Sequence, residues 1–291
     1  MNFGKVDDPS QIDFTLPITD KASVRVLKKF KKGSFNNVRI GCAKWNKKDL
    51  KNFYPKGAGD ELIYYSGEFN SVELNATFYR MFPEAQFKTW YEKSDKNFQF
   101  FPKVPRIISH NKRLKESDRL VDDFITNIQP LKKKLGMVFL QMPNNFHPKN
   151  IERLEPFFSH WPKEIPLALE LRHTDWYNDK DVAKQLYKTL EKYKIANALT
   201  DTAGRRDLLH MRLTSNTAFI RYVGANHSSD YKRLDDWMDR LEEWHKVGLR
   251  NLYFFIHQNV EKESPVLAAY FIEKFNDRFN TEIKIPKTLK K

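Results

Sequence analysis

The chain has 291 residues, of which 40% are hydrophobic and 30% charged, and this composition excludes an intrinsically disordered protein. Its single cysteine, Cys42, excludes an intrachain disulfide and any multi-cysteine zinc or iron–sulfur site. Lysine and arginine outnumber aspartate and glutamate by 51 to 37, a formal charge of +14, which favours anionic partners such as an anionic small molecule or a nucleic acid.

The predicted organisation is one folded domain with short ends. Residues 1–37 are predicted to be an N-terminal extension, in which Pro9 and Pro17 interrupt regular structure. Residues 38–285 are predicted to form the domain, and residues 286–291 a basic tail. The sequence contains neither an apolar signal region nor a run of about 18 apolar residues. We therefore expect a cytoplasmic protein with no membrane partner; the sequence predicts no oligomeric state.

Short β-rich runs alternate along the domain with segments of helical periodicity, which is typical of parallel βαβ units. Eight such runs are present, and this number predicts an α/β protein whose strands close into a (β/α)8 barrel of the TIM type. An open, doubly wound sheet is the alternative, but no glycine-rich dinucleotide turn follows the first run. The runs are 38–45, 69–79, 98–105, 137–143, 167–173, 195–201, 218–224 and 251–258.

Apolar residues at three- and four-residue steps predict the helices that cover the strands. The clearest helix is expected to begin near Ser117 and to end before Gly136. Further stripes predict buried helix faces at Val182, Leu186 and Leu190, at Leu234, Trp237, Met238, Leu241 and Trp244, and at Leu267, Phe271 and Phe275.

Polar residues gather toward the ends of the strands, where a barrel carries its functional groups. Side chains of a strand alternate between its faces, so Ser71, Glu73, Asn75 and Thr77 are expected to share one face of the second strand. On the fifth strand Glu170 and Arg172 are expected to point the same way. Late polar positions on the other strands are Lys103, Gln141, Asp201, Arg221 and His257, with Asn259 just beyond.

This group has two interpretations from the residues alone. One is an internal network of self-satisfied pairs, such as Glu170 with Arg172 or Glu73 with Lys103. The favoured one is a site, because burying several charges is costly even when they are paired. In that site Lys103, Arg172 and Arg221 would hold an anionic group.

In the favoured site, the carboxylates are expected to carry out the acid and base chemistry. Glu73 and Glu170 are the candidate acid and base, and Asp201 is a supporting carboxylate. No cofactor or metal is predicted, because three converging cations oppose the capture of a metal ion. A divalent metal held by the carboxylates and a histidine is the less favoured alternative.

The loop after the third strand adds His110 and several cations to the same rim, and a solvated loop is its alternative interpretation. His173 falls on the apolar register of the fifth strand, so a structural hydrogen bond is favoured over catalysis for it. The cations of the loop are Arg106, Lys112, Arg113 and Lys115.

The order of these segments resembles the YecE-like family, domain-of-unknown-function family 72. The motifs that carry the resemblance are IGCAKW with FYP, FNSVELNATFY, FPKVPRIISH, LQMP, ELRHTDW and IRYVG, which occur in order between residues 38 and 260. The resemblance implies a β/α barrel and brings no established activity. It implies that shared residues cluster at the strand ends, here Glu73, Asn75, Tyr79, Lys103, His110, Gln141, Glu170, Arg172, His173, Asp201 and Arg221.

Two positions depart from the family pattern. Val223 stands where the family commonly has a histidine, and His257-Gln258-Asn259 stands where it has an asparagine pair. The first hypothesis is therefore an enzyme of the hydrolase or lyase type that acts on a phosphate-containing ligand, with His257 in place of the lost imidazole. A non-catalytic nucleic-acid-binding protein and a glycoside hydrolase are the alternatives.

Overall fold

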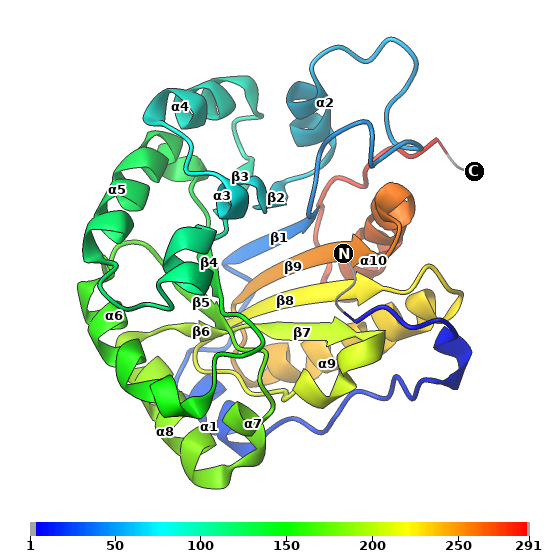
Figure 1. The fold of residues 1–291 in the computed structure, drawn as a ribbon. Helices are drawn as coiled ribbons and strands as arrows, with labels where there is room; N and C mark the ends of the chain where they lie inside the picture. Colours follow the sequence, from blue (N-terminus) through cyan, green and yellow to red (C-terminus); the bar gives the residue numbers. More distant parts are fainter. Residues whose placement is uncertain (1–3, 290–291) are drawn as a thin grey trace.

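The computed structural model describes residues 4–289, in which parallel strands form the interior and helices lie outside them (Figure 1). The strands are β1 (Asn37–Cys42), β2 (Ser71–Leu74), β3 (Gln99–Pro102), β4 (Val138–Gln141), β5 (Leu167–Glu170), β6 (Ala196–Asn197), β7 (Leu199–Thr202), β8 (Thr217–Gly224) and β9 (Asn251–Gln258). The helices are α1 (Lys21–Leu27), α2 (Glu61–Glu68), α3 (Ala76–Tyr79), α4 (Glu84–Lys93), α5 (Asp118–Ile128), α6 (Leu154–His160), α7 (Asp175–Asn178), α8 (Lys180–Tyr193), α9 (Ser229–Val247) and α10 (Ser264–Phe279).

The strands form two sheets, and all their pairings are parallel. A six-stranded sheet has the order β3-β2-β1-β9-β8-β7, and a three-stranded sheet has the order β4-β5-β6. An isolated parallel bridge between Lys103 and Phe139 links the ends of β3 and β4. The predicted sixth strand is divided into β6 and β7 at Ala198, whose amide donates to the Leu169 carbonyl at 2.9 Å. The predicted α/β class is confirmed, and each of the eight predicted runs overlaps at least one strand.

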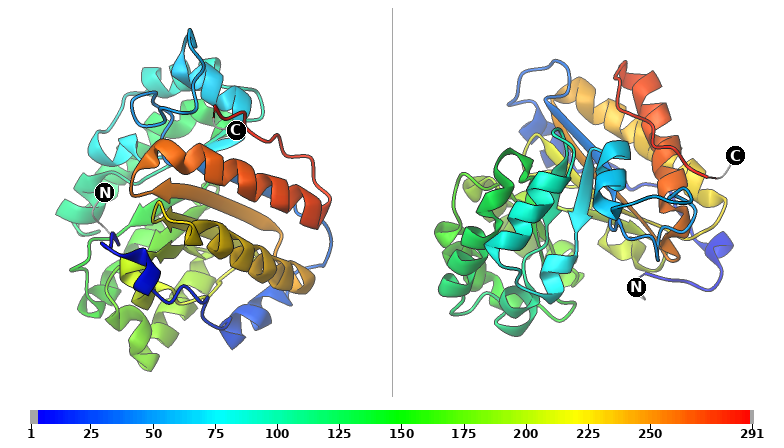
Figure 2. Two further views of the ribbon diagram at one scale, coloured as in Figure 1. Left: turned by 90° about the vertical axis from the view of Figure 1, so that its right-hand side faces the viewer. Right: turned by 90° about the horizontal axis from the view of Figure 1, so that it is seen from above.

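Helices cover the outer faces of the strands, as their apolar stripes predict. Figure 2 shows α9 and α10 side by side on the outside of β8 and β9. The stripe of α9, with Trp237 and Trp244, is buried, and so is that of α10 with Phe271. In the described part of the chain, no helix is both long and apolar enough to cross a membrane.

A smaller aromatic core lies between the inner faces of the two sheets. The Phe101 and Phe255 rings are 4.8 Å apart, and the Phe139 and Phe219 rings 5.5 Å apart. Because strand side chains repeat on one face at every second residue, the next inward position on each of these strands lies one layer nearer its carboxyl end. Those next positions are Lys103, His257, Gln141 and Arg221, and Glu170 follows the inward Ala168 of β5 in the same way. The aromatic core therefore forms the floor beneath a polar layer.

Two predicted elements end earlier than expected. The second strand stops at Leu74, because Asn75 has helical dihedral angles and α3 follows it. Thr77 therefore does not share the face of Glu73; its hydroxyl accepts from the Lys103 amide at 3.0 Å. The helix predicted to continue to Gly136 ends at Ile128, and a 3-10 helix containing Pro130 completes the segment.

The N-terminal residues pack along the outside of the domain. The Trp244 indole donates to the Thr19 hydroxyl at 2.8 Å, and Leu27 of α1 is fully buried. Gly4 accepts from the Gly204 amide at 2.8 Å, so the described segment begins beside the carboxyl end of β7. In the predicted tail, the Leu289 amide donates to the Asn52 carbonyl at 3.0 Å; residues 290–291 lie outside the described residues.

Candidate functional site

Arg221 of β8 joins two buried glutamates from opposite sides of the polar layer. Its Nε and Nη2 donate to Glu73 Oε2 and Oε1 at 2.8 and 2.9 Å, a two-pronged contact. Its Nη1 donates to Glu170 Oε2 at 2.7 Å. All three side chains are at most 2% exposed. This geometry fixes both carboxylates, because a guanidinium presents its donors in a rigid plane.

Glu170 also connects the network to β4 and β3. Its Oε1 accepts from Arg172 Nε at 2.5 Å and from Gln141 Nε2 at 2.9 Å. Gln141 Oε1 in turn accepts from Lys103 Nζ at 2.7 Å. The Lys103 ammonium lies over the Phe78 ring, 4.1 Å from its centroid, and also faces Phe139.

Glu73 has two further partners on its own side. Asn75 Nδ2 donates to Glu73 Oε1 at 2.7 Å, and His257 Nε2 lies 3.1 Å from Glu73 Oε2. The Asn75 Oδ1 atom is buried and has no hydrogen-bond partner among residues 4–289. His257 thus occupies a place in the network, at one of the positions where the sequence departs from the family pattern.

The charges and the burial of the network shift the pKa values of its ionisable groups. Burial alone would raise the pKa of Glu170, but the guanidiniums of Arg172 and Arg221 outweigh it and lower this pKa to about 2. The pKa of Glu73 is held well below its usual range against burial by Arg221 and His257. Burial, followed by repulsion from Arg221, lowers the pKa of Lys103 to about 7. Both carboxylates are therefore ionised at neutral pH, and Lys103 titrates there.

The remaining predicted residues lie at different distances from this network. His110 is close to it: burial and the charges of Lys103 and Arg172 lower its pKa to about 4. Its ring is 4.8 Å from that of Phe78. Tyr79 also contacts Phe78, with ring centroids 5.0 Å apart, but is 72% exposed.

Asp201 does not join the network, contrary to the expectation of a supporting carboxylate. It points to the helix side of β7, where Arg233 Nη2 donates to its Oδ1 at 2.9 Å and Trp237 Nε1 to its Oδ2 at 2.7 Å. Arg206 also contacts it. Burial would raise the pKa of Asp201, but the charges of Arg233 and Arg206 lower it. Asp201 therefore anchors α9 to the strand.

The pairings expected of a purely internal network are met in part. The pair of Glu170 with Arg172 is present, whereas Glu73 is bound by Arg221 and not by Lys103. Phe78, which covers Lys103, was not among the predicted site residues. The sequence feature that could have identified Phe78 is its position directly before Tyr79, in the segment where the strand ends and a helix begins.

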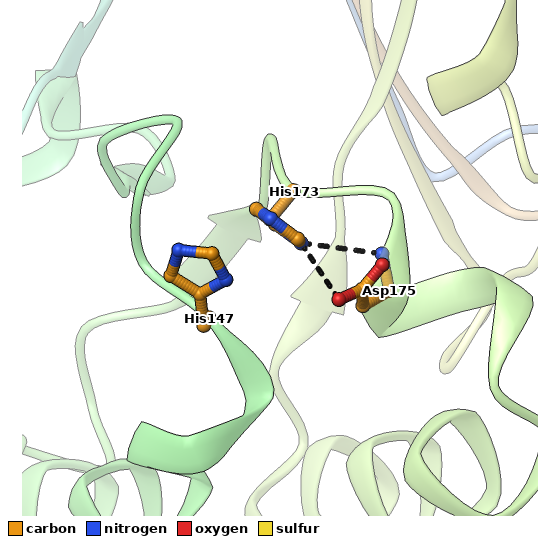
Figure 3. A group of neighbouring side chains, drawn as sticks. All are labelled: His147, His173 and Asp175. Atoms are coloured by element: carbon orange, nitrogen blue, oxygen red, sulfur yellow. Dashed lines mark hydrogen bonds and ion pairs between the residues drawn. The ribbon is translucent and has the colours of Figure 1, made fainter.

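His173 lies outside the network, in a group that the sequence does not reveal. It stands between His147 and Asp175, as Figure 3 shows. The predicted structural hydrogen bond is present, since its Nδ1 accepts from the Asp175 amide at 3.3 Å. His147 comes from the loop after β4 and is missed because 26 residues separate it from His173; the adjacency of β4 and β5 is the only signal for it.

Comparisons with known proteins identify relatives of this chain. The family model described as "Protein of unknown function DUF72" matches residues 39–290. The UPF0759 protein YecE of Escherichia coli K12 is 28% identical over 253 residues, covering 79% of this chain and 90% of YecE. The UPF0759 protein YunF of Bacillus subtilis 168 is 29% identical over 246 residues, covering 77% of this chain and 80% of YunF. The crystal structure of a DUF72 family protein from Enterococcus faecalis V583 superposes with a TM-score of 0.66 at 17% identity, covering 84% of this chain and 98% of that one.

Proposed function

Because the chain belongs to the DUF72 family of proteins of unknown function, we propose its activity from its own site: an enzyme of the hydrolase or lyase type that acts on a phosphate-containing small molecule. The observation that carries the proposal is the excess of cations in the polar layer. Glu73 and Glu170 supply two negative charges, whereas Arg221, Arg172 and a protonated Lys103 supply three positive ones. A buried excess of positive charge favours the binding of an anion.

The arrangement of the strands supports a barrel mouth as the location. The Lys103–Phe139 bridge connects β3 to β4, and β6 leads directly into β7, so that the two sheets continue into one another. We infer that together they form the eight-stranded barrel expected from the sequence. Active sites of such barrels lie at the carboxyl ends of the strands, which is where the polar layer lies.

The site suggests a division of roles that differs from the one expected from the sequence. A general acid or base works best when its pKa lies near the working pH. Lys103, with its pKa lowered to about 7, meets this condition, whereas Glu170, with a pKa of about 2, does not. We therefore assign proton transfer to Lys103. Glu73 and Glu170 position Arg221 and Arg172, which bind the anion.

The lowered pKa values of Glu73 and Glu170 argue against the glycoside hydrolase alternative. That chemistry requires one carboxyl group to stay protonated and donate its proton to the leaving group. Arg221 lies between Glu73 and Glu170 and contacts both, and the pKa of each is lowered. Neither carboxyl group is suited to the acid role.

A thermal-shift screen tests the anion site, since a ligand that binds only the folded state raises the melting temperature. The ligands are inorganic phosphate, sugar phosphates and nucleoside monophosphates, each paired with its unphosphorylated counterpart. The variant is Arg172→Ala, and the matched control is Arg278→Ala, which removes the same charge from the exposed face of α10.

We expect stabilisation by a phosphorylated compound and not by its counterpart, with the shift retained in Arg278→Ala and lost in Arg172→Ala. Turnover of the compound should then be lost in Lys103→Met. Equal shifts in the two arginine variants, or stabilisation by no phosphorylated compound, would contradict the proposal.

The nucleic-acid-binding alternative rests on a separate observation. Arg106, Lys112 and Lys115 are exposed in the segment after β3 that also contains His110. Together with the formal charge of +14 they favour a polyanion. In a non-catalytic nucleic-acid-binding protein, the buried Lys103 would have no chemical role. Turnover of any substrate would therefore show that nucleic-acid binding is not the protein's sole function.

A further inference from the structure

The loops after β4 and β5 bring two imidazoles and a carboxylate together at the rim of the strands. His147 precedes the 3-10 helix Pro148–Arg153, His173 follows β5, and Asp175 begins α7 (Figure 3). One ligand atom from each of the three lies within 4.8 Å of the others. We propose that these residues form a binding site for one divalent transition-metal ion.

The distances are close to those that a shared metal ion requires. Two ligand atoms bound at 2.0–2.1 Å to a tetrahedral ion lie about 3.3 Å apart. His173 Nδ1 and Asp175 Oδ2 are 3.5 Å apart, and the two imidazole centroids 4.0 Å apart. The widest gap has to close by roughly 1.5 Å relative to that spacing. Side-chain rotation suffices for this, because Asp175 is exposed and both histidines are only partly buried.

The donor set selects the kind of metal. Imidazole nitrogen suits zinc, copper, nickel and iron, whereas magnesium and calcium prefer oxygen ligands. Two histidines and one carboxylate are the ligands of catalytic zinc sites and of non-haem iron sites, and three protein ligands leave positions for water or a substrate. The inferred ion is therefore of the Zn²⁺ or Fe²⁺ class and remains open on one side.

The contacts already made by these residues permit metal binding. The Asp175 amide donates to His173 Nδ1 at 3.3 Å, so a lone pair of that nitrogen points toward Asp175. A metal ion would replace this long hydrogen bond, and the exposed amide would bond to water. The nearby Arg205 guanidinium is paired with Asp207 at 3.0 Å, which reduces its repulsion of a cation.

The inferred metal also extends the anion site, although it does not depend on it. His173 follows Arg172 directly in the chain, so an ion held here would add positive charge at the carboxyl end of the strand whose Arg172 contacts Glu170. A metal ion with open positions stabilises phosphoryl oxygens as a Lewis acid. Metal binding is measured without any substrate, so it succeeds or fails separately from the proposed enzymatic function.

Titration of the untagged, metal-free full chain with Co²⁺ and Zn²⁺ tests the site. Visible absorption reports the coordination of Co²⁺, and calorimetry gives the stoichiometry and affinity for Zn²⁺. The variants are His147→Ala, His173→Ala and the isosteric Asp175→Asn. The matched control is His160→Ala, which removes a partly exposed imidazole that also lies between two carboxylates, those of Asp118 and Asp122.

We expect one equivalent of metal to bind and EDTA to reverse it. Each of the three variants should weaken binding by roughly ten-fold or more, since each loses a direct ligand, whereas His160→Ala should not. Melting curves without metal should be nearly unchanged, because these side chains are not core residues. Absence of a Co²⁺ spectrum, or equal affinities in His147→Ala and the wild type, would overturn the inference.

Discussion

Lys103 and Lys134 are two buried lysines with different surroundings. Lys134 Nζ donates to the Tyr91 carbonyl at 2.6 Å, the Ser94 carbonyl at 2.7 Å and the Ser94 hydroxyl at 3.0 Å. Among the described residues, Lys103 Nζ donates to one neutral acceptor, Gln141, and it lies near the Arg221 charge that repels it. A buried ammonium with few acceptors is costly, so Lys103 is expected to reduce the stability of the fold.

Lys103→Met is therefore predicted to raise the free energy of unfolding at pH 6.5 by about 1–3 kcal/mol. Lys134→Met, the matched control, is predicted to lower it by about 1–3 kcal/mol, because it leaves acceptors unpaired. Urea denaturation of the three proteins measures both changes. Similar losses in the two variants would show that Lys103 is a structural residue like Lys134.

The gain in the free energy of unfolding that is predicted for Lys103→Met should depend on pH. The folded-state pKa of Lys103 is about 7, below its usual 10.5, so between these values the unfolded chain holds a proton that the folded chain has released. The stability of the wild type relative to the variant should therefore rise as pH increases from 7 toward 10.5. As pH falls through 7, Lys103 is protonated in the folded state and the full cost of burying its ammonium group returns. Repeating the urea measurement at pH 9.5 should give a smaller difference than at pH 6.5.

The end of α9 meets the N-terminal segment at Gly248. Its φ is +152°, and a Cβ there would lie 2.1 Å from the carbonyl oxygen of Leu27 in α1. Neither backbone can shift easily, because Leu27 is fully buried. A glycine is required here both by its conformation and by the close approach of the two segments.

Gly248→Ala is predicted to destabilise the protein by about 2–4 kcal/mol. Gly67→Ala is the control: Gly67 lies in α2, a Cβ there meets nothing within 4 Å, and alanine in a helix should stabilise by about 0.5–1 kcal/mol. Thermal unfolding of both variants measures the difference. A neutral Gly248→Ala would mean that α1 separates readily from α9.

The elements also show which features sequence patterns could predict. Alternation within a strand predicted that Glu170 and Arg172 point the same way, and in the structure Arg172 Nε donates to Glu170 Oε1 at 2.5 Å. It failed for Thr77, since the two-residue period ends with the strand at Leu74. Asp201 could have been placed outward, because it shares its face with the large apolar Leu199, but a list of late polar residues ignores register.

The sequence could not predict which cation pairs with Glu73, for a different reason. Which cation reaches Glu73 depends on the distance across the interior between β2 and β8, strands that are not neighbours in the sheet. Arg221 spans this distance and meets Glu73, whereas Lys103 is drawn to Gln141 on the adjacent β4. His147 and His173 follow the paired strands β4 and β5, and this pairing brings them together although no spacing in the chain reveals it.

At the scale of the whole molecule, the formal charge of +14 is compatible with either a local or a diffuse attraction for anions. Exposed lysines occur at both ends of the strands. Lys112 and Lys115 lie on the loop after the carboxyl end of β3. Lys132 and Lys133 lie near its beginning, where the Lys133 carbonyl accepts from Gln99 at 3.3 Å.

These two pairs allow matched double variants, Lys112→Ala/Lys115→Ala and Lys132→Ala/Lys133→Ala, which remove the same charge at opposite ends of β3. If the mouth is a small-molecule site, a single-stranded oligonucleotide is attracted only by the net charge. We therefore expect both double variants to weaken its binding equally and to reduce the slope of log affinity against log salt by the same amount. Fluorescence anisotropy over a range of salt concentrations measures this. A loss confined to Lys112→Ala/Lys115→Ala, with a slope lower by about 1 for each phosphate contact removed, would instead identify the rim as a nucleic-acid interface and favour the alternative function.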